Sequence, residues 1–131
     1  MNSLLYAANE GTQTLADGQN ISFGTPVRRF GKNLNLSGGN VVANGEGYYP
    51  VDANVTFRAG ATGDATLQIY ENGVAIPGAN AKTTVSSTSA FNSLVVPTAF
   101  RIKCCEEKTI TASIKGVAAT VSNAGIRVMK A

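Results

Sequence analysis

A period of two runs through residues 47–60, and this feature most narrows what the chain can fold into. In the stretch GYYPVDANVTFRAG, apolar side chains occupy every second position: Tyr49, Val51, Ala53, Val55 and Phe57. From residue 52 onward the positions between them are polar or charged. Because successive side chains of a β-strand point to opposite faces, this alternation predicts a strand with one buried face.

A second stretch, ATLQIYENGVAIPGA, predicts a β-hairpin. Leu67 and Ile69 alternate with polar neighbours, and apolar residues resume at Val74 and Ile76. Between these runs stands Asn72-Gly73, a pair that readily adopts the positive φ angles of a tight two-residue turn. We therefore expect two antiparallel strands joined at this pair.

Similar runs cover most of the remaining chain, and no stretch shows a convincing helical pattern. Short runs with turn signals between them predict an all-β sandwich or barrel of nine or ten strands, in a single domain spanning residues 1–131. The Ser/Thr-rich segment 82–93 suits either an edge strand or a loop. The further runs lie at residues 3–8, 20–30, 33–37, 40–44, 82–96, 99–104, 108–114 and 119–130.

The last of these runs cannot be a regular strand throughout. Val121 lies on one parity, whereas Ile126 and Val128 lie on the other. One extra residue must be absorbed between them, and we expect a β-bulge at 123–125.

Composition argues against catalysis. The 131 residues include no histidine, which removes the commonest general base and the commonest nitrogen ligand for metals, and a serine triad with it. Carboxylates that could work as a glycosidase pair stand mostly at turns or outward positions. We therefore expect no enzyme activity, cofactor or metal. The acids considered are Asp52, Asp64, Glu71, Glu106 and Glu107.

Charge and hydropathy limit the partners. The net charge of +3 is spread thinly, without the dense basic stripe that nucleic-acid binding usually requires. No segment approaches the roughly 18 apolar residues of a membrane span, and the first residues do not resemble a signal peptide. We expect a protein that is made in the cytoplasm and binds neither nucleic acid nor membrane.

Both cysteines are adjacent, at Cys104-Cys105. Neighbouring side chains of a strand point apart, so the pair suits neither one metal ion nor a relaxed disulfide. Parity places Cys104 in the core together with Phe100 and Ile102, and Cys105 on the opposite face. We interpret the segment as the end of a strand.

Four motifs in order resemble the C1q/tumour-necrosis-factor-like jelly roll, above all its small bacterial and phage versions. They are G-x-Y-x-V at 47–51, V-x-F at 55–57, Y-x-N-G-x-x-x-P-G at 70–78 and N-A-x-I-x-V at 123–128. The resemblance extends from about residue 4 to residue 129. It implies two sheets, chain ends on adjacent strands and a compact trimer.

Apolar groups on both faces of some strands agree with a trimer, because one domain can bury only one face. Tyr48 follows this pattern beside Tyr49, Met129 beside Val128, and Tyr70 beside Ile69. From strand parity and the resemblance together, we expect the trimer interface to include Tyr6, Tyr48, Asn54, Arg101, Lys103 and Met129.

The resemblance also implies a non-enzymatic function: a phage or prophage virion component, such as a head fibre, a decoration or a tail-associated knob. Its partners would be other copies of itself, with capsid or tail proteins or a host surface glycan as further partners. Two alternatives stay open. One is a carbohydrate- or receptor-binding module that uses loops such as 60–64 and 70–80, and the other is a spore-surface domain.

Overall fold

The structure, a computed structural model, describes residues 3–104 and 106–130. All regular secondary structure in these ranges is β-strand. The eleven strands are β1 Ser3–Asn9, β2 Gln13–Leu15, β3 Thr25–Phe30, β4 Leu34–Ser37, β5 Asn40–Asn44, β6 Gly47–Ala59, β7 Gly63–Glu71, β8 Val74–Val85, β9 Asn92–Ile102, β10 Glu107–Lys115 and β11 Ala119–Lys130.

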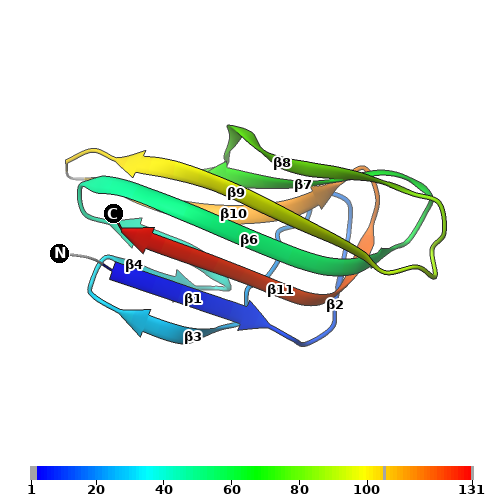
Figure 1. Cartoon of the computed structure of the whole chain (residues 1–131), viewed down its shortest axis with the longest axis horizontal. Helices are drawn as coiled ribbons and strands as arrows, with labels where there is room; N and C mark the ends of the chain where they lie inside the picture. The colour runs from blue at the N-terminus through cyan, green and yellow to red at the C-terminus, as the bar shows by residue number, and fades with distance from the viewer. Residues whose placement is uncertain (1–2, 105, 131) are drawn as a thin grey trace.

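These strands form two antiparallel sheets that pack face to face (Figure 1). The first sheet has the order β3-β1-β11-β6-β9, with β2 also paired to β11, and the second has the order β4-β5-β10-β7-β8. The first and last long strands, β1 and β11, are paired along their length from Ser3 opposite Lys130, so the first and last strands are neighbours as expected.

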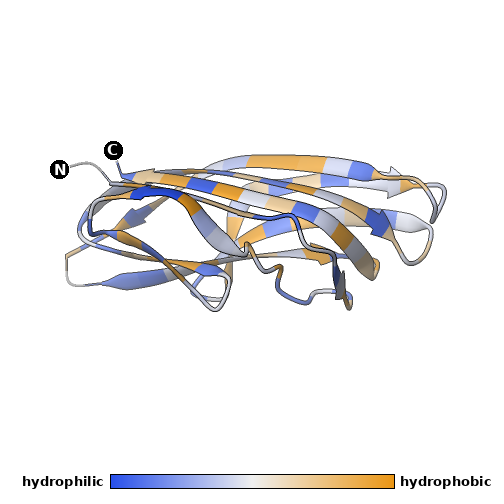
Figure 2. Ribbon diagram, turned by 90° about the horizontal axis from the view of Figure 1, so that it is seen from below, coloured by the Kyte–Doolittle hydropathy of each residue, from blue (hydrophilic) through white to orange (hydrophobic). Residues whose placement is uncertain are grey.

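Strand alternation builds the core, as residues 47–60 predict. Every second residue of β6 from Tyr49 to Phe57 is buried, and the inward faces of both sheets meet in one continuous apolar cluster. The Tyr49 ring stacks on that of Phe100, with 5.0 Å between the ring centroids. Figure 2 shows apolar and polar residues alternating along the long strands.

The predicted hairpin is confirmed as β7 and β8. Its turn is formed by Asn72 and Gly73, which have φ angles of 49° and 81°. The predicted bulge in β11 is also present, but it lies one residue earlier than expected. The register against β6 shifts between Val121 and Asn123, so Ser122 is the extra residue, and its hydroxyl donates to the Thr56 carbonyl oxygen at 3.2 Å.

Two predicted runs differ from the observed strands. The run at 20–30 yields a strand only from Thr25. Before it, Ile21 and Phe23 are buried like strand residues. Their backbone N–H groups, however, donate to the carbonyl oxygens of two different segments, at Ala112 and Gly39, and so do not form a continuous ladder with one neighbouring strand. The chain then turns at Gly24, which has a φ of +75°.

The run at 82–96 is interrupted by a loop. β8 ends at Val85, and the Ser87 hydroxyl there bonds to Ser89, so local side-chain bonds compete with the sheet. β9 then continues without a break to Ile102 and tolerates Pro97 because it is an edge strand. The three-residue strand β2 is too short for its pattern to stand out in the sequence.

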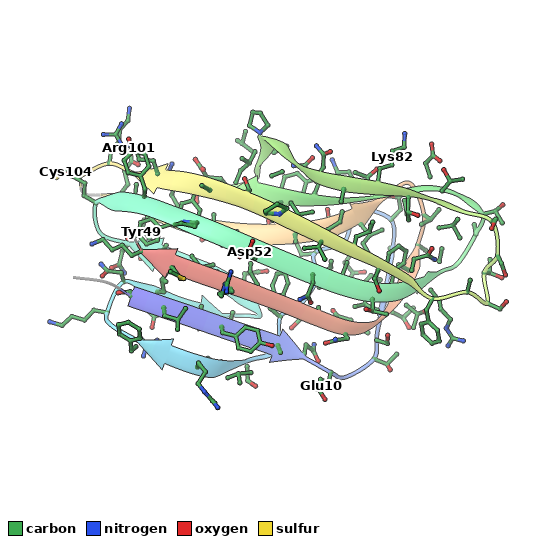
Figure 3. All side chains as sticks on the ribbon, in the orientation of Figure 1. Glu10, Tyr49, Asp52, Lys82, Arg101 and Cys104 are labelled. Carbon is green, nitrogen blue, oxygen red and sulfur yellow. The ribbon has the colours of Figure 1, made fainter. Side chains whose placement is uncertain are left out.

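The prediction that Cys104 enters the core is wrong. Phe100 and Ile102 are buried as expected, but β9 ends at Ile102 and Cys104 is exposed in the turn that follows (Figure 3). Parity holds only while the strand lasts, so it could not place a residue beyond the strand end. The other cysteine, Cys105, lies outside the described residues.

Candidate functional site: the outer face of the first sheet

The first sheet presents one face to the core and the other to the surroundings. We call the second face the outer face. It consists of the outward-pointing residues of the strands between β3 and β9, because their neighbours in sequence are buried. These residues include Leu4, Tyr6, Ala8, Tyr48, Pro50, Asp52, Asn54, Val95, Pro97, Ala99, Arg101, Gly125, Arg127 and Met129, with Phe30 on the edge strand.

Large apolar side chains are exposed on this outer face. Tyr6, Met129 and Phe30 are 39 %, 43 % and 56 % exposed, and Tyr48 and Val95 are 61 % and 62 % exposed. The register places Leu4 opposite both Phe30 and Met129, so these three form an apolar row across neighbouring strands. Single exposed apolar residues are ordinary, but a group on one sheet face is typical of an interaction surface.

An ion pair lies among these apolar side chains on the outer face. The Arg127 guanidinium on β11 contacts the Asp52 carboxylate on the neighbouring strand β6, and both side chains remain about half exposed. Tyr6 stands opposite Arg127 in the β1–β11 register. Asp52 lies near the middle of the face in Figure 3. In water such a pair contributes little to stability, but it gives the face one fixed charged position.

The residues expected at a trimer interface can now be placed. Tyr6, Tyr48, Asn54 and Met129 lie on the outer face, and so does Arg101, whose guanidinium carbon is 5.4 Å from the centre of the Tyr48 ring. Lys103 follows the end of β9 and is exposed in the same turn as Cys104.

Two of the exposed large apolar residues of the face, Val95 and Phe30, escaped the sequence reasoning. Val95 had a usable signal, since it stands beside the buried Val96 just as Tyr48 stands beside Tyr49. Phe30 had none, because its place on the face depends on β3 pairing with β1. Neither parity nor composition predicts that pairing.

The second sheet differs on its outside. Its outward residues on β10 are Thr109, Thr111, Ser113 and Lys115. Among the described residues on its strands, Val74 is the only large apolar residue that is exposed. A groove of about 610 Å³ crosses this side. The two sheets therefore offer surfaces of opposite character.

The loops expected to bind carbohydrate do not form one site. Residues 60–64 lie at the start of β7, and the Asn72-Gly73 turn lies at its other end. A nine-residue strand separates the two by about 30 Å. Only the Asn72-Gly73 end takes part in the groove.

Among the described residues, Asp64 and Tyr49 have shifted pKa values, and both shifts have structural causes. Hydrogen bonds from Thr84 and from Lys82, with the charge of Lys82, lower the pKa of Asp64 at the surface. Burial raises the pKa of Tyr49, whose hydroxyl donates to the Asn44 and Gly45 carbonyl oxygens at 2.8 and 2.6 Å. Neither group lines the groove.

Residues 3–104 and 106–130 contain no group of three or more potential ligands that could hold a metal ion. Nor do they contain a helix of the length and apolarity needed to cross a bilayer.

Comparison with known proteins shows which solved structures share this fold. No protein-family model matches the sequence, and neither does any curated protein. Solved structures do match. Murine APRIL is 18 % identical with a TM-score of 0.78, covering 100 % of both chains. The Eiger TNF of S. frugiperda is 11 % identical with a TM-score of 0.73, covering 100 % of this chain and 92 % of that one.

A C1q domain matches as well. The globular domain of the zebrafish complement 1qA protein is 12 % identical with a TM-score of 0.66, covering 95 % of this chain and 94 % of that one. At such low identities the likeness concerns the fold alone. The expected all-β, two-sheet jelly roll is confirmed, and this chain has the TNF/C1q-like jelly-roll fold.

Proposed function

We propose that this protein is a non-enzymatic structural protein whose jelly roll assembles into a compact homotrimer through the outer face of the first sheet. The observation that carries the proposal is the set of large apolar side chains on that face: Tyr6, Phe30, Tyr48, Val95 and Met129. The threefold symmetry comes from the resemblance to C1q and TNF domains, and self-association through one face comes from the residues.

Burial of this face would stabilise the assembly. Each Å² of apolar surface removed from water contributes about 25 cal/mol, before the entropy cost of association is subtracted. Assembly would also bury the ion pair of Arg127 and Asp52, which is already formed in the single chain. A preformed pair of this kind favours one register over others more than it adds affinity.

A structural role also agrees with the pKa shifts of Asp64 and Tyr49. The Asp64 pKa is lowered by its neighbours at an exposed site, and the Tyr49 pKa is raised in a buried one. A catalytic group is usually tuned toward the working pH inside a cleft. Both shifts instead move the group further from neutral pH.

The virion role is the finer part of the proposal, and it rests on the resemblance to small phage and prophage proteins. A trimeric knob would attach by one end or by exposed loops to a capsid or tail. Mass spectrometry of particles purified after induced lysis of the source culture tests this role. We expect the chain to be enriched with the particles, and its loss during purification would contradict a virion position.

Two charge insertions test the assembly. Met129→Glu puts a carboxylate on the outer face, so burial of three copies should raise the monomer fraction at least tenfold at micromolar concentration. Val74→Glu is the matched control, because Val74 is 69 % exposed on the second sheet. Light scattering coupled to size exclusion measures both, and equal masses for the two variants would contradict the proposed interface.

A further inference from the structure

The groove on the outer side of the second sheet lies apart from the surface proposed for assembly. It is about 610 Å³ in volume, which falls within the usual range for small-ligand sites. Its residues come from three parts of the chain: the segment before β3, the middle of β10 and the β7–β8 turn. They are Gly18, Asn20, Tyr70, Asn72, Gly73, Thr109, Thr111 and Ser113.

The floor of the groove is a row of hydroxyl groups. Thr109, Thr111 and Ser113 alternate along β10 and so share one face of the sheet. Asn20 lies beside them, because the segment before β3 bridges to Ser113. Within the described part of the chain, the side chains of Asn20, Thr109 and Thr111 form no hydrogen bond to protein, so their donors and acceptors are available to a ligand.

The wall opposite Asn20 is held in place by several contacts. Asn72 is fixed to β10 by two hydrogen bonds. Its side-chain oxygen accepts from the Thr109 backbone N–H at 2.8 Å, and its backbone N–H donates to the Thr109 carbonyl oxygen at 2.9 Å. The Tyr70 hydroxyl lies 3.5 Å from the Ser113 hydroxyl. The groove is therefore formed before a ligand arrives, which lowers the entropy cost of binding.

Tyr70 adds an aromatic surface to this polar site. Its ring is partly exposed, and the Lys115 ammonium lies 5.0 Å from the ring centroid. A lysine side chain is flexible and solvated, and such a contact at an exposed site is weak, so a ligand can displace it. A ligand with an apolar face and polar edges would match the ring and the hydroxyl floor together.

The charge of the groove narrows the ligand class. None of its lining side chains is charged at neutral pH. The charge that lies against the groove is the Lys115 ammonium, which rests over the Tyr70 ring. The Lys108 ammonium is already paired, since it lies 2.6 Å from the Glu71 carboxylate and 2.8 Å from the Arg101 carbonyl oxygen. Hydroxyl and amide groups without net charge suit an uncharged ligand that both donates and accepts many hydrogen bonds.

We propose that this groove binds a neutral saccharide, with Tyr70 against a face of the sugar ring and Asn20, Thr109 and Thr111 bonded to its hydroxyls. The site lies on the second sheet and so stays open if the first sheet forms the trimer interface. Three copies would then raise a weak single-site affinity through multivalency.

An array of neutral and acidic glycans, followed by titration of the best glycan into isotope-labelled protein, tests this inference. Wild-type protein should bind neutral glycans, and the amide signals of β10 and the β7–β8 turn should shift. Thr111→Val removes one hydroxyl at nearly constant shape and should weaken binding about fivefold or more. Thr66→Val is the matched control: Thr66 lies on the neighbouring strand outside the groove and should bind like wild type.

Three outcomes would overturn the inference. One is the absence of neutral-glycan binding by wild-type protein at concentrations up to about 10 mM, where even millimolar affinities are detected. Another is equal binding by Thr111→Val and Thr66→Val. A third is binding of acidic glycans only. The molecular mass of each variant, measured in the same experiment, separates these outcomes from a failure of the proposed trimer.

Discussion

The Tyr49 side chain links the turn between β5 and β6 to the core. Its ring stacks on Phe100, and its hydroxyl reaches the carbonyl oxygens of Asn44 and Gly45 in the turn between β5 and β6. The adjacent Tyr48 points the opposite way and is exposed. The alternating pattern predicts which of the two tyrosines is buried, but the hydrogen-bond partners depend on how the neighbouring turn is folded.

Removing the Tyr49 hydroxyl should therefore destabilise the protein. Tyr49→Phe keeps the stacked ring but removes the hydroxyl donor from the part-buried Gly45 carbonyl oxygen and one of two side-chain donors from that of Asn44, which also accepts from the Asn33 side chain at 2.8 Å. This loss should cost about 1–2 kcal/mol in the free energy of unfolding. Urea unfolding at fixed protein concentration measures this. Tyr48→Phe is the control and should change the same quantity by less than about 0.5 kcal/mol. Equal losses in both variants would contradict the structural role of the Tyr49 hydroxyl.

The same hydroxyl gives a pH dependence with a definite sign. Burial raises the pKa of Tyr49 in the folded state, so the unfolded chain releases this proton first. The stabilisation is fully present below the ordinary tyrosine pKa of about 10 and is lost as pH rises through the folded-state value. Stability above pH ~10 should fall less steeply in Tyr49→Phe than in wild type, and parallel curves would contradict this assignment.

At the scale of elements, two turns between neighbouring strands depend on glycine. The β7–β8 turn and the β10–β11 turn both contain a glycine with positive φ, 81° at Gly73 and 98° at Gly116. They differ in their surroundings. A Cβ at Gly73 would meet nothing within 4 Å, whereas a Cβ at Gly116 would lie 2.1 Å from the Asp64 carbonyl oxygen.

The two glycines should therefore respond differently to alanine. Gly73→Ala adds only backbone strain and should lower the free energy of unfolding by about 1 kcal/mol. Gly116→Ala adds a backbone clash and should cost about 3 kcal/mol or more. Thermal unfolding of both variants compares them directly. A Gly116→Ala protein as stable as Gly73→Ala would show that the close approach to Asp64 is wrong.

Element boundaries show where sequence reasoning succeeds and where it stops. The Asn72-Gly73 turn was predictable, because that pair has its own conformational preference. The end of β9 at Ile102 was not, since parity gives a face but no stopping point, and Cys104 was misplaced for that reason. The interruption after Val85 likewise depends on serine side chains bonding locally within the loop.

At the scale of the whole molecule, the two outer surfaces have opposite chemistry. The first sheet exposes apolar groups such as Met129 and Phe30, and the second exposes a hydroxyl-lined groove. Part of the first surface was predictable from adjacent apolar residues, as at Tyr48. Phe30 and the groove were not, because they depend on which strands become neighbours: β3 beside β1, and the segment at Asn20 beside β10.

The trimer is the central claim, and the mass of the native particle tests it most directly. Sedimentation equilibrium of wild-type protein at micromolar concentration should give about three times the chain mass of 13.5 kDa. The same mass should persist in high salt, because burial of apolar surface is screened far less than charge pairing. A particle of 13.5 kDa under these conditions would contradict the account.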